Sequence, residues 1–98
     1  MTDYTTGKDV RVQAQRLAEA LGKKFSVNGD CWDRKENKAI VGCWIVDCNP
    51  TYGGCIIEEM FNEHGAVSHP IMELRQPPRE LVQSIRFALR VLEIEREE

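Results

Sequence analysis

AIVGCWIVDC (residues 39–48), NPTYGG (49–54) and CIIEEMFN (55–62) follow one another in the middle of the chain. The first and last segments are rich in β-branched and aromatic residues, which is typical of β-strands. The Asn-Pro and Gly-Gly pairs between them are typical of a turn. This stretch predicts two strands, 39–48 and 55–62, paired as an antiparallel hairpin.

The sheet extends beyond this hairpin. A glycine-containing turn at 63–65 leads to a third short strand at about 66–69, and strands joined this closely form an antiparallel meander. Upstream, residues 25–27 predict a short strand. Residues 30–38 are charged and polar around Trp32 and predict a loop.

An amphipathic helix precedes the sheet. Thr6 and Asp9 have the spacing of a capping box, and Gly22 has the position of a helix-ending glycine. Between them the apolar residues recur at helical spacing on one stripe, which is formed by Val10, Ala14, Leu17, Ala18 and Leu21.

A second helix follows the sheet and begins at Pro77-Pro78, where proline costs a helix least. Its core stripe is Leu81, Val82, Ile85, Ala88, Leu89 and Leu92. The acidic tail, residues 93–98, is expected to fray. The order predicts a two-layer α+β domain over residues 1–98, in which both helices cover one face of a three-stranded antiparallel meander (α-β-β-β-α).

The C-terminal helix carries a second apolar row, Phe87, Val91 and Ile94. At ~100° per residue this row lies about 150° from the core stripe. It packs either on the N-terminal helix or N-terminal segment of its own chain, or against another chain. We expect the second case and predict a homodimer through this helix.

A row of arginines, Arg79, Arg86 and Arg90, lies beside the apolar row. One interpretation is a solvated face, paired in part with glutamates at helical spacing. The other is a surface that grips an acidic partner or phosphates. Helix-strand-strand-strand-helix is also the order of double-stranded-RNA-binding domains, but the second helix here lacks their Lys-rich start.

Composition bounds the function. The chain has 98 residues and a net charge of −3, which argues against nucleic-acid binding, because phosphate contacts need a basic excess. The N-terminus lacks the pattern of a signal peptide, and the apolar run 40–46 is too short to span a membrane. The sequence therefore predicts a cytoplasmic protein, with Cys31, Cys43, Cys48 and Cys55 as free thiols.

Residues with metal-binding or catalytic chemistry form no convincing site. Cys43, Cys48, His64 and His69 read C-x4-C-x15-H-x4-H, which resembles a zinc site. The two cysteines lie five residues apart on a predicted strand, so their side chains point to opposite faces. The neighbours Glu58 and Glu59 are separated in the same way and cannot act as a pair. We predict no metal, no cofactor and no enzymatic activity.

Several short motifs carry a resemblance to a known group of proteins. Tyr52-Gly53-Gly54, then Asn62-Glu63 with Gly65 and Val67-Ser68, then Arg86-Phe87-Ala88-Leu89 resemble a pattern in small uncharacterised accessory proteins of tailed phages and prophages. The resemblance covers the C-terminal half and provides no catalytic residues. It implies a factor that binds a host or phage protein, for example to inhibit a host defence system.

Together these features predict a small, non-catalytic protein-binding accessory factor. Its partner-binding residues are Phe87, Val91, Ile94, Arg79, Arg86 and Arg90. The first alternative is an RNA- or DNA-binding module that uses the arginine row. The second is a small zinc-binding protein. The identity of the protein partner is not predicted.

Overall fold

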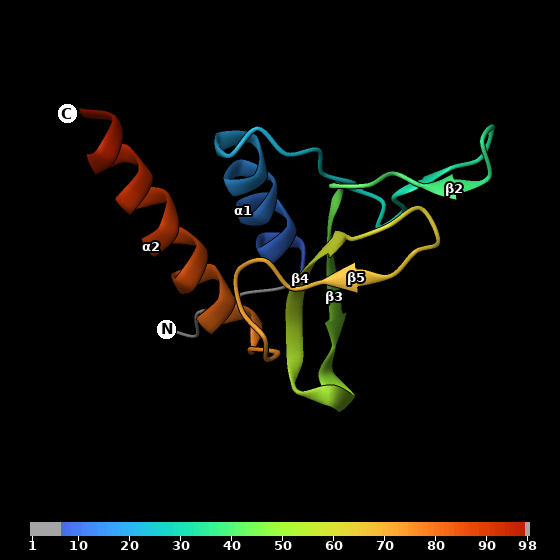
Figure 1. Cartoon of the computed structure of the whole chain (residues 1–98). Coiled ribbons are helices and arrows are strands. Elements are labelled where there is room, and N and C mark those ends of the chain that lie inside the picture. Colours follow the sequence, from blue (N-terminus) through green and yellow to red (C-terminus); the bar gives the residue numbers. More distant parts are fainter. Residues whose placement is uncertain (1–6, 98) are drawn as a thin grey trace.

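The computed structural model describes residues 7–97 and has the predicted α+β architecture (Figure 1). The predicted N-cap, Thr6, lies outside the described residues. In chain order the elements are α1 (Gly7–Ala20), β1 (Trp32–Asp33), β2 (Lys38–Ala39), β3 (Trp44–Asn49), the 3-10 turn η1 (Pro50–Tyr52), β4 (Gly54–Met60), β5 (Val67–Ser68) and α2 (Pro78–Glu97).

The predicted meander is present as the antiparallel sheet β3-β4-β5. β3 pairs with β4 along its whole length, from Trp44 opposite Glu59 to Asn49 opposite Gly54. Asn49 caps the turn between them, because its side-chain oxygen accepts from the backbone N–H of Thr51 at 3.0 Å. The alternation of side chains along these strands places one row of apolar residues toward the helices.

The region before β3 differs from the prediction. Residues 30–38 are not a loop throughout, since β1 and β2 form a small antiparallel hairpin there. Asp33 shapes its turn by accepting from the backbone N–H groups of Lys35 and Glu36 at 3.0 and 3.2 Å. The predicted strand 39–48 is divided, because Gly42 takes a left-handed conformation (φ 84°) that interrupts extended backbone.

The predicted strand at 25–27 is reduced to a single bridge. Phe25 pairs with Trp44 in parallel, through the backbone of its neighbours. The N–H of Trp44 donates to the carbonyl of Lys24 at 2.8 Å, and the N–H of Ser26 donates to the carbonyl of Trp44 at 2.9 Å. This segment therefore covers only the start of the outer edge of β3.

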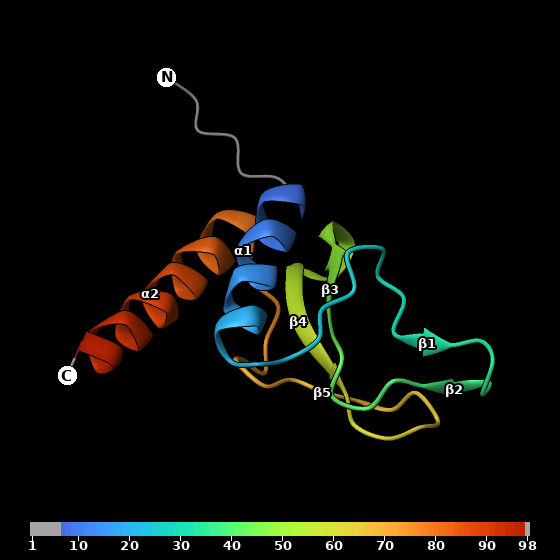
Figure 2. The same cartoon turned by 90° about the horizontal axis from the view of Figure 1, so that it is seen from above.

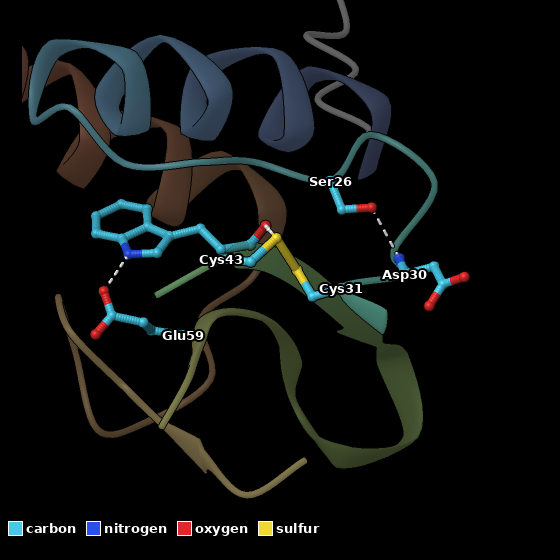
Figure 3. Close-up of a disulfide and its surroundings, with 6 residues drawn as sticks. Ser26, Asp30, Cys31, Cys43 and Glu59 are labelled. Atoms are coloured by element: carbon cyan, nitrogen blue, oxygen red, sulfur yellow. Dashed lines mark hydrogen bonds between the residues drawn. A yellow bond between two sulfur atoms is a disulfide. The ribbon is translucent and has the colours of Figure 1, made fainter. Parts of the chain in front are cut away.

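The main core lies between the sheet and the helices, which both pack on the same side of the sheet, as expected (Figure 2). Trp44 and Ile57 are almost completely buried on the sheet face below the helices. The indole N–H of Trp44 donates to Glu59 at 2.6 Å (Figure 3). The remaining buried members are Val10, Ala14, Leu17, Ala18, Val46, Cys55, Leu81, Val82 and Ile85.

The end of α1 follows from Gly22. This residue has φ 72°, and the N–H groups of Gly22 and Lys23 donate to the carbonyls of Glu19 (3.1 Å) and Ala18 (2.8 Å), which is a Schellman motif. Leu21, which we expected on the core stripe, lies past the helix end and is exposed.

α2 begins as predicted and continues further than predicted. The carbonyl of Pro77 accepts from the N–H of Leu81 at 3.0 Å, which closes the first turn. We expected the helix to fray from residue 93, and this is wrong, because α2 continues to Glu97. Arg96 donates to the carbonyl of Ala20 and so links the ends of the two helices. Glu98 lies outside the described residues.

The expectation of four free cysteines is wrong. Cys31 is bonded to Cys43, and Cys48 is bonded to Cys55. The first disulfide joins the β1–β2 hairpin to the chain before β3 and sits in a second small core with Ala39 and Met60 (Figure 3). The second joins two residues that face each other directly in the β3–β4 pairing. Sequence spacing alone did not reveal either contact.

Candidate functional site

The second apolar row of α2 is exposed. Phe87, Val91 and Ile94 are 72%, 47% and 47% exposed, whereas Leu81 and Ile85 on the core stripe are completely buried. The row therefore does not pack on α1. Packing on the N-terminal helix was one of the two ways in which its own chain could have covered it. The other invoked the N-terminal segment, whose residues 1–6 lie outside the described part of the chain.

The arginine row is distributed over two places. Arg86 and Arg90 face a groove between α1 and α2, where Arg16 of α1 joins them. Arg79 lies in the first turn of α2, exposed and away from that groove. The structure thus brings together two of the three predicted arginines and adds one that the sequence reasoning missed.

We call this feature the arginine groove. Its first hollow has a volume of about 220 Å³ and is lined by Gln13, Arg16, Arg86, Leu89, Arg90 and Glu93. A second hollow of about 380 Å³ adjoins it, shares Arg16, Leu89 and Glu93 with it, and reaches the end of α1 and Arg96. Half-buried Leu89 and Leu92 supply apolar surface between the charged groups.

The electrostatics of the arginine groove are unbalanced. Arg90 donates to Glu93 at 3.1 Å, so the carboxylate in the first hollow is already engaged. Arg16 and Arg86 form no ion pair with any residue between 7 and 97. A groove with two uncompensated guanidinium groups attracts anions, and a guanidinium binds carboxylate or phosphate through two parallel hydrogen bonds.

The face of the sheet away from the helices carries polar side chains that contact one another. Arg75 is bonded to the carboxylate of Asp47 and donates to two backbone carbonyls, at residues 47 and 54, at 3.0 Å each. His69 lies 3.4 Å from Glu58. Glu58 and Glu59 face opposite sides, as the strand spacing predicted. A shallow hollow of about 570 Å³ on this face is bordered by exposed Tyr52 and Leu74.

The C-x4-C-x15-H-x4-H residues are not assembled as one site. Cys43 and Cys48 are bonded to different cysteines, and His64 is exposed in a turn next to Glu63. In the described part of the chain, no three His, Cys, Asp or Glu side chains come together as a group that could hold a metal ion. Among residues 7–97 there is also no helix with the length and apolar character needed to cross a membrane.

Comparisons with family models, with curated proteins and with solved structures found no match to this chain. Two exposed features of the chain itself point to a function, the apolar row of α2 and the arginine groove between α1 and α2.

The sequence contained an indirect signal for two of the features that were missed. Cys48 and Cys55 are placed symmetrically about the turn 49–54, so a register that pairs Asn49 with Gly54 also brings the cysteines together. Arg16 lies beside the buried Leu17 on α1, at the border of the core stripe. Only the docking of α1 against α2 turns that position into a neighbour of Arg86.

Proposed function

We propose that the protein is a non-catalytic protein-binding accessory factor that forms a homodimer through α2 and uses no cofactor. The observation that carries the proposal is the exposed row of Phe87, Val91 and Ile94. Leaving a large apolar side chain in water forgoes about 1.5–3 kcal/mol of burial free energy. A row of three such side chains on one helix face is typical of a surface that contacts another chain.

The charges along α2 support a second copy as the first partner. The N-terminal part of the helix, residues 78–90, carries three arginines and one glutamate, and the C-terminal part, residues 91–97, carries three glutamates and one arginine. Two copies related by a two-fold axis across the helix run antiparallel. The net positive charge of each N-terminal half then attracts the net negative charge of the other copy's C-terminal half, and the helix dipoles are also opposed favourably. Arg86 itself stays beside Arg16 in the groove between α1 and α2.

Sedimentation equilibrium tests the dimer. We expect the wild-type protein to be dimeric in the micromolar range and Phe87→Glu to be monomeric, because the charge would be buried without a partner. Val12→Glu is the matched control, since Val12 is a single exposed apolar residue (49%) on α1. A wild-type protein that stays monomeric at high micromolar concentration contradicts the proposed homodimer.

The biological setting is proposed from the resemblance to accessory proteins of tailed phages and prophages. Such a factor acts by binding, and we propose that this one binds a host protein, for instance a component of a defence system. Crosslinking of the protein expressed in host cells, followed by mass spectrometry, identifies that partner. The Phe87→Glu variant, expressed and crosslinked in the same way, is the control.

A cytoplasmic location remains a proposal, and the two disulfides count against it. Disulfides persist in oxidising compartments and are rare in the cytosol. Alkylation of the protein directly on cell lysis, followed by mass spectrometry, decides the question. Alkylation of all four cysteines supports a cytoplasmic location, whereas a protein with no alkylated cysteine supports an oxidising compartment.

Nucleic-acid binding through the arginine row is the second candidate, and the clustering of Arg16 with Arg86 and Arg90 is the observation in its favour. The net charge of −3 opposes it, because duplex binding depends on neutralising several phosphates at once. Salt-dependent binding of a duplex in the micromolar range, lost in Arg86→Glu, would place this candidate first.

A further inference from the structure

We propose that the arginine groove between α1 and α2 is a binding site for an acidic protein segment. The inference rests on the proposed protein-binding function and names the chemistry of a second partner. Its basis is the pairing of Arg16 and Arg86, which come from different helices, face the same hollow and have no ion pair within residues 7–97.

The placement of the unpaired arginines supports a ligand here. Arg11 and Arg79 also have no ion pair within residues 7–97, but Arg16 and Arg86 in addition line the same hollow. Arg75, Arg90 and Arg34 are each bonded to a carboxylate of the same chain. In a protein with a net charge of −3, acidic side chains are not scarce, yet none within residues 7–97 forms an ion pair with Arg16 or Arg86. The potential of this groove is therefore positive against an acidic background, and an incoming carboxylate would be attracted to it.

The apolar surface of the groove identifies the ligand as a peptide. Leu89 belongs to both hollows, and Leu92 lines the second. An acidic segment can place carboxylates on Arg16 and Arg86 while an aliphatic side chain rests on the two leucines.

Nucleic acid fits the same surface less well. Single strands are held mainly by stacking of bases on aromatic side chains, and no aromatic residue lines either hollow. Glu19 and Glu93 stand along the groove, where a continuous phosphate backbone would meet them. The positive potential is thus local, which suits one or two carboxylates and opposes a long chain of phosphates.

The apolar row and the arginine groove lie on different parts of α2. Phe87 follows Arg86 by one residue, so at ~100° per residue the two side chains point in clearly different directions. Arg16 belongs to α1. A dimer through the apolar row therefore leaves the arginine groove open, and the two surfaces can be tested separately.

Fluorescence anisotropy tests the inference with a labelled short peptide of glutamate and leucine as the probe, and with the same peptide carrying glutamine for every glutamate as its control. We expect saturable binding of the acidic peptide only. Arg16→Gln and Arg86→Gln are each expected to weaken it about tenfold or more, because each removes a charge-assisted hydrogen bond. Arg34→Gln, an exposed arginine on the β1–β2 hairpin, is expected to bind unchanged.

Several outcomes overturn the site. These are equal binding of the glutamine peptide, unchanged binding by both groove variants, no binding by the wild type, or tighter binding of a duplex oligonucleotide than of the acidic peptide. Sedimentation equilibrium on the same samples separates this inference from the proposed dimer. A dimer that does not bind the peptide eliminates only the groove site, and a monomer that binds it eliminates only the dimer.

Discussion

α1 and α2 pack side by side on the same layer, yet they differ in what they leave exposed (Figure 2). Each helix buries one apolar stripe, through Leu17 on α1 and Ile85 on α2 for example. Within the 14 residues of α1, Val12 is the one large apolar side chain that is exposed, whereas α2 exposes three in a row. Packing within one chain accounts for one stripe per helix, so the second row of α2 requires another explanation.

The difference in length agrees with this reading. α2 has 20 residues and α1 has 14, so α2 is the longer by about 9 Å at 1.5 Å per residue. Its C-terminal end reaches past α1 in Figure 2. Apart from the bond of Arg96 to Ala20, the last turns of α2 therefore have less of their own chain to pack against, and contact with another chain would cover them. Substitutions of decreasing effect test the comparison between the helices.

The largest effect is expected from the buried stripes. Leu17→Ala and Ile85→Ala should each lower the free energy of unfolding by about 2–5 kcal/mol, because each leaves a cavity in the core. Phe87→Ala removes a larger side chain but should change the stability of the monomer by less than about 0.5 kcal/mol. Urea denaturation at low protein concentration measures all three. A large loss for Phe87→Ala would show that the row is buried within its own chain.

Next comes the end of α1. Gly22→Ala should cost about 1–2 kcal/mol, because an L-residue with a Cβ is strained at φ 72°. Gly22→Asn is the matched control and should cost less, since asparagine tolerates this conformation. Thermal unfolding followed by circular dichroism gives both values. Equal stability of the wild type and both variants would mean that the Schellman motif does not end the helix in solution.

The link between the helix ends should contribute less. Arg96→Ala removes the bond to the carbonyl of Ala20 and should lower the free energy of unfolding by at most about 1 kcal/mol. It should also increase hydrogen exchange in the last turn of α2. Arg86→Ala, on the same helix without such a bond, serves as the control. Fast exchange in the last turn of the wild type would contradict the link.

The smallest effects on monomer stability are expected from one exposed valine on each helix. Val12→Ser and Val91→Ser should each change the free energy of unfolding of the monomer by less than about 0.5 kcal/mol. They should differ in self-association, which Val91→Ser weakens and Val12→Ser leaves unchanged. Analytical ultracentrifugation over a concentration series compares them. Equal dimerisation of both variants would remove the distinction between α1 and α2.

The two helices, the strand pairing of the meander and the second apolar row of α2 could be predicted from the sequence. Each of these depends on residues close together in the chain: a 3.6-residue period for the helices, β-branched runs for the strands, and Gly53-Gly54 for the turn between β3 and β4. The fold class follows from them, because the amphipathic faces must be buried against each other.

The tertiary structure alone decided which distant residues meet. The pairing of Cys31 with Cys43 and the approach of Arg16 to Arg86 join residues that no local period connects. The β1–β2 hairpin is local, but the charged residues between its strands hide the alternation that predicts strands. Gly42 fits a strand pattern by its apolar neighbours, and only its left-handed backbone shows that the strand is interrupted. Local propensity fixes where elements form, but their docking depends on burial summed over the whole chain, and that sum determines the Cys31–Cys43 disulfide and the arginine groove.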